Sequence, residues 1–166
     1  MIKVGDTLPN ATLMEYSDVE GEGCSIGPNP VDVAKASAGK TIAVFALPGA
    51  FTPTCSAKHL PGFVDKNADL KKKGVDLVAC LSVNDAFVMD AWGKDQKVGD
   101  KVLMLADGSA DFAKAVGLEL DLVANGMGVR IKRFSMLVED GVVKTLNVEK
   151  PGAFEVSDAG TMLKQA

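Results

Sequence analysis

The sequence has 166 residues, of which 47% are hydrophobic and 24% are charged, and these values predict one soluble globular domain over residues 1–166. The 18 basic and 22 acidic residues give a net charge of −4, which argues against a general attraction to nucleic acid. No apolar run approaches the roughly 20 residues that a membrane span needs, so we expect neither nucleic acid nor a membrane as a partner.

The chain begins MIKVGDTLPNATL, without the basic start and apolar core of a secretory signal. We therefore expect a cytoplasmic protein, with an organelle address removed beforehand as the alternative. Residues 20–30, EGEGCSIGPNP, are typical of a polar surface connection, and PVDVAKASA (30–38) is expected to form a short helix.

Three apolar stretches rich in β-branched residues follow, and each is predicted to be a buried strand: TIAVFAL (41–47), VDLVACLSV (75–83) and KVLMLAD (101–107). A helical pattern comes after each strand, over residues 56–73, 84–95 and 109–117. In the first helix the expected core positions are Leu60, Phe63, Val64 and Leu70. Asn84 or Asp85 is the expected N-cap of the second. This alternation predicts a parallel sheet with right-handed crossovers.

The last third of the chain has a different pattern. Residues 130–149, RIKRFSMLVEDGVVKTLNVE, contain two strand-like runs around Asp140-Gly141, a strong signal for a β-hairpin. Residues 157–165 are expected to form a terminal helix. A parallel βαβ half followed by an antiparallel hairpin is the order of an α/β, thioredoxin-like fold, with a central mixed sheet flanked by helices.

Cysteine and histidine are scarce in this sequence. The three cysteines are Cys24, Cys55 and Cys80, and an odd number in an intracellular-looking chain argues against a framework of structural disulfides. Their separations of 31 and 25 residues contain no CxxC pair and no repeated ligand spacing for zinc. His59 is the single histidine, so we predict no metal site, and we expect no cofactor.

Cys55 lies in a segment crowded with turn-forming residues, ALPGAFTPTCSAKHLPGF (46–63), directly after the first buried strand. Ligands of open α/β sheets bind beyond the carboxyl ends of the strands. A helix start there would favour a thiolate through its free amide hydrogens and positive dipole end, and the hydroxyl of Thr52 could lie near the sulfur. The residues alone leave two interpretations: a buried cysteine that caps a helix, and a thiol presented for reaction.

The pattern Pro48-x-x-x-Thr52-x-x-Cys55 resembles the active-site signature of the peroxiredoxins, and PGAFTPTCSAKHLPGF is similar to the form found in their atypical type-II and type-five group. Two further blocks, VACLSVNDAFVMDAW (78–92) and KRFSMLVEDGVVKTLNVE (132–149), resemble the same group in the expected order. The resemblance covers most of the chain from IKVGD onward, and it implies a thiol peroxidase.

The resemblance also implies a role for each matching residue. The thiolate of Cys55 would attack a hydroperoxide and become a sulfenic acid, with release of water or an alcohol. Thr52 would hydrogen-bond the peroxide, Pro48 would shield the sulfur, and Arg133 would stabilise the thiolate with its permanent charge and bind the peroxide. Hydrogen peroxide and small alkyl hydroperoxides are the implied substrates, and a homodimer is the implied assembly.

Two residues near these positions have roles that the pattern leaves open. Arg130 lies three positions before Arg133, so on an ideal strand their side chains would point to opposite faces. We expect one arginine to face the site and the other to be solvated or paired with an acid, and the motif favours Arg133 as the first. His59 shares a helix face with Cys55 and is either a catalytic base or a packing or interface residue.

The reduction of the sulfenic acid is the least determined step. Some relatives carry a resolving cysteine near the C-terminus, but VEKPGAFEVSDAGTML contains none. Cys80 matches a cysteine of many type-II relatives, and we favour a buried structural residue over a resolving cysteine. Cys24 has no counterpart in the family. The expected scheme is one-cysteine turnover, in which glutathione with glutaredoxin, or a thioredoxin, reduces Cys55 from outside.

Three aromatic residues, Phe51, Phe87 and Trp92, are candidates for the pocket edge or for a dimer contact near the site. Two other function classes compete with a peroxidase. A thiol–disulfide oxidoreductase of the same fold would need CxxC, but Thr52 occupies the position of its first cysteine. A peroxide-sensing relay protein would use the same residues as the peroxidase and would differ only in turnover.

Overall fold

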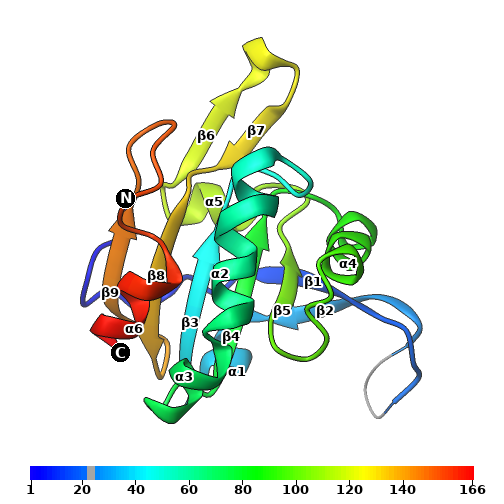
Figure 1. The fold of residues 1–166 in the computed structure, drawn as a ribbon. Helices are drawn as coiled ribbons and strands as arrows, with labels where there is room; N and C mark the ends of the chain where they lie inside the picture. The colour runs from blue at the N-terminus through cyan, green and yellow to red at the C-terminus, as the bar shows by residue number, and fades with distance from the viewer. Residues whose placement is uncertain (22–24) are drawn as a thin grey trace.

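The computed structural model describes residues 1–21 and 25–166, and Figure 1 shows their arrangement. The centre is a seven-stranded mixed sheet in the order β2-β1-β5-β4-β3-β8-β9, and a two-stranded sheet, β6-β7, projects beyond one end of it. The strands are β1 (Thr12–Ser17), β2 (Gly27–Asp32), β3 (Thr41–Ala46), β4 (Leu77–Ser82), β5 (Leu103–Ala106), β6 (Glu119–Leu122), β7 (Gly128–Ile131), β8 (Phe134–Glu139) and β9 (Val142–Val148).

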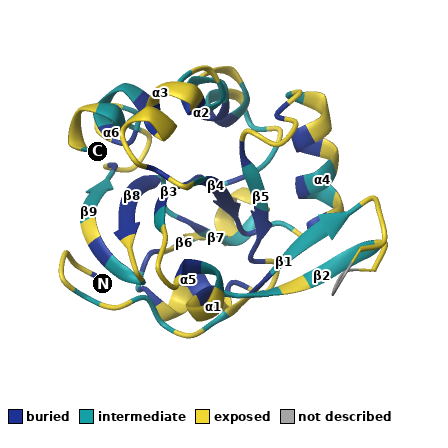
Figure 2. Cartoon of the chain, turned by 90° about the horizontal axis from the view of Figure 1, so that it is seen from below, coloured by how far each residue is buried: buried dark blue, intermediate teal, exposed yellow. Residues whose placement is uncertain are grey.

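Helices cover both faces of the sheet. In Figure 2, α2, α3, α4 and α6 lie on one face, and α1 and α5 lie on the other. The helical segments are α1 (Val33–Ser37), a π-helix η1 (Cys55–His59), α2 (Leu60–Asp65), α3 (Asn67–Lys72), α4 (Ala86–Asp95), α5 (Asp111–Ala115), a 3₁₀ turn η2 (Val123–Asn125) and α6 (Ala159–Gln165). None of these helices, within the described residues, combines the length and the apolarity that crossing a membrane requires.

The predicted fold class is confirmed. The three apolar runs form β3, β4 and β5, which pair in parallel, and β8 and β9 add antiparallel strands beside β3. The β8–β9 hairpin turns at Asp140 and Gly141, whose φ angles of 47° and 77° are the positive values that a tight type I′ hairpin needs. Asp85 caps α4 by accepting the N–H of Val88 at 2.8 Å.

The helix predicted over residues 56–73 is divided into three segments. It opens as the π-helix η1, and a break at Lys66, where ψ is 7°, separates α2 from α3. Pro61 explains the wide first turns, because a proline has no N–H and its ring crowds the carbonyl four residues earlier. Leu60, Phe63 and Leu70 are buried as expected. Val64 packs against the core while only partly buried.

The first forty residues correct a further prediction. Residues 30–38 were expected to be a helix, but Pro30–Asp32 belong to β2 and the helix begins only at Val33, where the Asp32 carboxylate accepts the N–H of Lys35 at 3.1 Å. The sequence did not indicate β1, β2 or β6, and it indicated only the last two residues of β7. Cys24 lies outside the described residues.

The strand-like run predicted over residues 130–139 is also broken. Strand β7 ends at Ile131 and pairs with β6, whereas β8 begins at Phe134 and pairs with β3 and β9. Lys132 and Arg133 therefore form the bend between two different sheets. This bend lies beside the start of α2 at the carboxyl ends of β3 and β4.

Candidate active site

Cys55 lies in the first helical turn after β3. The N–H of Leu47 bonds to Leu81 O at 3.2 Å and ties the end of β3 to β4, and the chain then turns through Pro48. Helical geometry begins at Pro53, a favoured residue at the first helical position because its missing N–H would have no helical partner. Cys55 opens the π-helix and its side chain is fully buried. Single turns of π-helix are rare and occur frequently at functional sites.

The guanidinium of Arg133 lies directly beside this sulfur. Its Nη2 donates to Cys55 Sγ at 3.0 Å, although 78 positions separate the two residues in the sequence. A bond from a permanent cation to a thiolate is charge-assisted and favours the ionised sulfur. The structure thus brings together the two residues that the peroxiredoxin pattern selected as nucleophile and cation.

His59 contacts the same guanidinium and does not act on the sulfur. Arg133 Nη1 donates to His59 Nδ1 at 2.8 Å, and His59 Nε2 lies 2.9 Å from Ser157 O. These partners require the neutral ring with its hydrogen on Nε2. Burial, together with the positive charge of Arg133, lowers the pKa of His59 to about 3. Of the two roles considered for His59, a catalytic base and a packing or interface residue, its complete burial and its contacts favour packing, and its bond with Arg133 orients that guanidinium as well.

Glu149 organises the loop on which His59 depends. Its carboxylate accepts the N–H groups of Glu155, Val156 and Ser157 and the hydroxyl of Ser157, at 2.7 to 3.0 Å. Burial opposes ionisation of Glu149, but these hydrogen bonds outweigh it and place the pKa of the carboxyl below its usual range. The Glu149 N–H also donates to Arg133 O at 3.0 Å. No local pattern in the sequence indicates this loop, because its contact with His59, through Ser157 O, joins residues 98 positions apart.

Pro48 and Thr52 line the turn before Cys55. The Thr52 hydroxyl donates to Gly49 O at 2.7 Å. The sequence suggested that this hydroxyl could lie near the sulfur, but the described residues show no hydrogen bond between them. Pro48 is half-buried and borders a groove that also contains Thr54 and Arg133. Both residues lie in the turn before Cys55, and their roles toward a peroxide remain predictions from the family pattern.

The expectation for Arg130 was wrong. Arg130 is half-buried and forms no ion pair with an acid in the described part of the chain; it donates instead to the carbonyl oxygens of Met127 at 2.8 Å and Val83 at 3.2 Å. Alternation along one strand did not apply, since the chain bends between β7 and β8. Arg130 joins this bend to the end of β4, while Arg133 reaches the sulfur.

The three aromatic candidates separate into two groups. Trp92 is fully buried, and its Nε1 donates to Ser56 Oγ at 3.1 Å, so the prediction of a pocket-edge or dimer residue was wrong for Trp92. The indole secures the turn that carries Cys55. Phe51 and Phe87 remain 54% and 62% exposed and are available for a surface contact.

The neutral state of His59 predicts a specific loss of stability in acid. The pKa of His59 is about 3 in the folded protein, whereas an unperturbed histidine, as in an unfolded chain, has a pKa of 6.5, so the unfolded state binds more protons between these values. The contribution of His59 is fully present above pH 6.5 and falls as the pH drops toward 3, by on the order of 4 kcal/mol in total.

His59→Gln tests this, because glutamine can accept from Arg133 and donate to Ser157 but does not titrate. Urea unfolding at pH 7 and at about pH 5 should show that the wild-type protein loses about 2 kcal/mol more than the variant. Equal pH slopes for the two proteins would show that His59 is not held neutral by the fold.

Comparison with known proteins agrees with this geometry. The Redoxin family model matches residues 3–163. Peroxiredoxin-2E, a chloroplastic protein of Arabidopsis thaliana, is 50% identical over 165 residues, which cover 98% of this chain and 68% of that protein. Peroxiredoxin-2B of the same plant is 45% identical over 163 residues, covering 98% of this chain and 97% of that protein.

Solved structures show the same relationship. The reduced Prx3 of Vibrio vulnificus in complex with hydrogen peroxide is 51% identical, with a TM-score of 0.92 over 99% of each chain. Peroxiredoxin 5 of Alvinella pompejana is 30% identical, with a TM-score of 0.82 over 99% of this chain and 97% of that one. Identity at this level over the whole length, together with the contact between Arg133 and Cys55 of the signature, shows that the chain belongs to the type-II group of the peroxiredoxins, the thiol peroxidases.

Proposed function

We propose that Cys55 reduces hydrogen peroxide and small alkyl hydroperoxides by attack of its thiolate on the terminal oxygen. The S–O bond forms as the O–O bond breaks, the sulfur becomes a sulfenic acid, and the departing oxygen takes up a proton to give water or an alcohol. The observation that carries this proposal is the 3.0 Å bond from Arg133 to Cys55 Sγ. The Vibrio protein that binds hydrogen peroxide supports the choice of substrate.

Within this reaction, Arg133 stabilises negative charge on the sulfur and on the departing oxygen, as preorganised donors do in other transition states. Its two terminal nitrogens are oriented by Cys55 and His59. Thr52 donates a hydrogen bond to the bound peroxide after leaving Gly49 O, and Pro48 limits the access of water to the sulfur. These two roles follow from the family pattern and from the position of both residues in the turn before Cys55.

Turnover proceeds with one cysteine. Cys80 is fully buried in β4, a central strand whose partners at this position are Phe45 and Met104 on either side. Burial, together with the nearby Cys55, raises the pKa of the Cys80 thiol well above its usual range, so Cys80 stays protonated and is a poor nucleophile.

An external thiol then reduces the sulfenic acid. Glutathione forms a mixed disulfide with Cys55 and releases water, and glutaredoxin or a second thiol regenerates the thiolate; thioredoxin is the other reductant proposed. We place the protein in the cytoplasm as a homodimer. The exposed Phe51 and Phe87 support a contact between subunits on the side where Cys55 lies.

Cys80→Ser is expected to keep most of the peroxidase activity with glutathione and glutaredoxin, or with thioredoxin. Steady-state peroxide consumption measures this activity. Mass spectrometry of the wild-type protein, treated with peroxide and glutathione, should show a glutathione adduct on Cys55 and no bond between Cys55 and Cys80. If Cys80→Ser stopped at the sulfenic acid or mixed disulfide, the one-cysteine scheme would be wrong. Consumption of one peroxide per chain and no more would instead indicate a peroxide sensor.

A further inference from the structure

A groove lies beside the residues around Cys55. It has a volume of about 190 Å³, and its lining includes Arg133, which contacts Cys55, with Pro48 and Thr54. The same lining combines two lysines, Lys132 and Lys150, with apolar surface from residues such as Leu120 and Ala153. The lysines come from the β7–β8 bend and from the chain just after β9, so two separate segments contribute them.

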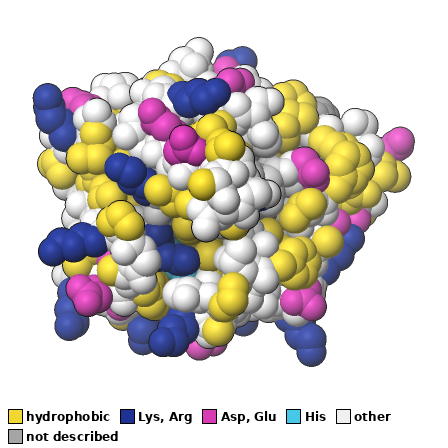
Figure 3. All heavy atoms as spheres, turned by 90° about the horizontal axis from the view of Figure 1, so that it is seen from above, with side chains coloured by type: hydrophobic (Ala, Val, Ile, Leu, Met, Phe, Trp, Pro, Cys, Tyr) yellow, Lys and Arg dark blue, Asp and Glu magenta, His cyan; other side chains and the backbone are white. Residues whose placement is uncertain are grey.

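The groove has a positive charge that the chain as a whole lacks. No carboxylate lies within ion-pair distance of Lys132 or Lys150 among residues 1–21 and 25–166. The one acidic residue that lines the groove, Glu149, already binds backbone N–H groups with both carboxylate oxygens. Figure 3 views the molecule from above, where basic and acidic side chains are interspersed, so the charge of the groove depends on the residues that line it. An anion entering the groove would meet two lysines that form no ion pair within the described residues.

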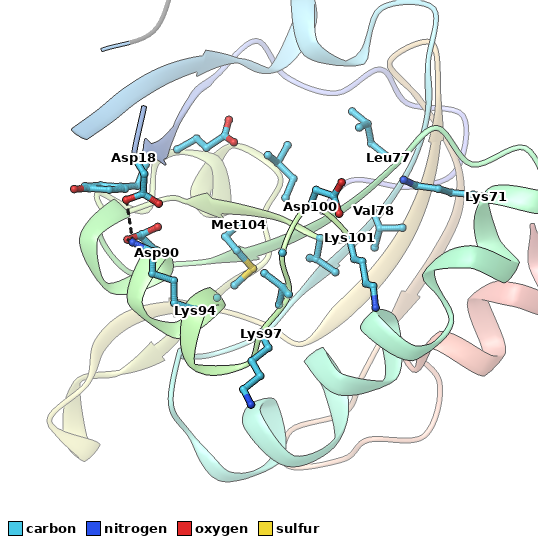
Figure 4. Close-up of a pocket in the computed structure, with 17 residues that line it drawn as sticks. Asp18, Lys71, Leu77, Val78, Asp90, Lys94, Lys97, Asp100, Lys101 and Met104 are labelled. Atoms are coloured by element: carbon cyan, nitrogen blue, oxygen red, sulfur yellow. Dashed lines mark hydrogen bonds and ion pairs between the residues drawn. The ribbon is translucent and has the colours of Figure 1, made fainter. Parts of the chain in front are cut away.

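A second lysine-rich pocket differs from this groove in its position and in the pairing of one of its lysines with acids. It has a volume of about 470 Å³ and lies where β4 and β5 begin, at the opposite end of the strands from Cys55. Figure 4 shows Lys94 beside two carboxylates, and Lys94 forms ion pairs with Asp18 at 2.9 Å and Asp90 at 3.0 Å. This pocket has no connection to the reaction, but it provides an exposed lysine, Lys71, for a control.

We propose that Lys132 and Lys150 bind a carboxylate on the peroxide substrate, so that the enzyme prefers alkyl hydroperoxides with an apolar chain and an acidic end. This inference rests on the proposed function and names a substrate class for the same site. The apolar wall accommodates the chain and the two lysines contact the acid. Arg133 is not the carboxylate ligand, because its guanidinium is already bound to Cys55 and His59.

The carboxylate belongs to the peroxide and not to the reducing thiol. Cys55 is fully buried in this conformation, which is that of the protein before oxidation. The reactant that must reach the sulfur at this stage is the peroxide, whose –OOH group is small, and the thiol reacts only afterwards. The reaction itself is unchanged: the terminal oxygen is transferred to the sulfur, and the alcohol that carries the carboxylate leaves. Attraction by the lysines therefore increases the rate of oxidation of the reduced protein.

The test is the rate of oxidation of the reduced protein by a hydroperoxy fatty acid and by its methyl ester, measured in a single turnover without thiol. The ratio of the acid rate to the ester rate should fall about threefold in Lys132→Gln or Lys150→Gln and about tenfold in the double variant. The same ratio should fall in the wild-type protein as salt is raised. Lys71→Gln, which loses the same charge at the other pocket, should leave the ratio unchanged.

Three outcomes would overturn the proposal. The first is a ratio that does not change in the double variant, and the second is an equal fall in Lys71→Gln, which would indicate only an effect of net charge. The third is found with matched thiols: if the lysine variants slow reduction of the sulfenic acid by 3-mercaptopropionate but not by 2-mercaptoethanol, and leave the peroxide ratio intact, the groove serves the reductant. Oxidation by hydrogen peroxide is recorded in parallel, and its absence would reject the proposed function itself.

Discussion

Cys55→Ser is expected to reduce peroxide consumption to the rate of the protein-free reaction. A serine hydroxyl fits the buried site, since it is no larger than the thiol, but it does not ionise near neutral pH and cannot form a sulfenic acid. The fold should persist, because Arg133 retains an oxygen acceptor in place of the sulfur. Coupled assays with glutathione and glutaredoxin, and with thioredoxin, measure the activity.

Cys80→Ser is the matched control, because it makes the same substitution at another fully buried cysteine on the same side of the sheet. It is expected to lower the thermal midpoint of unfolding, since a hydroxyl is placed in an apolar strand, and to leave most of the activity. Peroxide turnover that survived in Cys55→Ser, with the fold intact by circular dichroism, would remove Cys55 from the reaction.

Arg133→Gln is expected to slow oxidation of Cys55 by hydrogen peroxide about 100-fold, the effect of removing one preorganised donor from a site where charge develops. Glutamine removes the permanent cation and leaves at most a neutral hydrogen bond. Arg133→Lys should give an intermediate rate, because a lysine keeps the charge but cannot contact Cys55 and His59 at once with a planar fork.

Two measurements separate this role from a loss of folding. Stopped-flow oxidation gives the rate constant for hydrogen peroxide, and the time course of alkylation by iodoacetamide reports the reactivity of the Cys55 sulfur, which should fall in Arg133→Gln. Lys71→Gln, with the same loss of charge on an exposed helix, controls for the overall field. A wild-type alkylation profile together with a wild-type rate in Arg133→Gln would contradict the role assigned to the guanidinium.

Local sequence patterns were sufficient for the elements that are buried on both faces. Strands β3, β4 and β5 appear as continuous apolar runs because helices cover both sides of the parallel sheet. Strand β2 gave no such signal: it contains Pro28 and Pro30, and prolines are tolerated in it because it pairs with β1 alone, at the edge of the sheet. Strands β6 and β7 are short and half-exposed, which leaves them without an apolar run.

The amino-acid pattern alone identified the family and selected Cys55 and Arg133 as the candidate nucleophile and cation, because these residues lie within short motifs of characteristic spacing. It could not assign Arg130 or Trp92, whose partners are the carbonyls of another strand and the hydroxyl of Ser56. The hydrogen bonds that link His59 to Ser157 and Ser157 to Glu149 could not be predicted either, since each bond joins segments that only folding brings together. A motif records which groups the chemistry needs, whereas their orientation and protonation depend on long-range packing, which decides what each group contacts and how far it is removed from water.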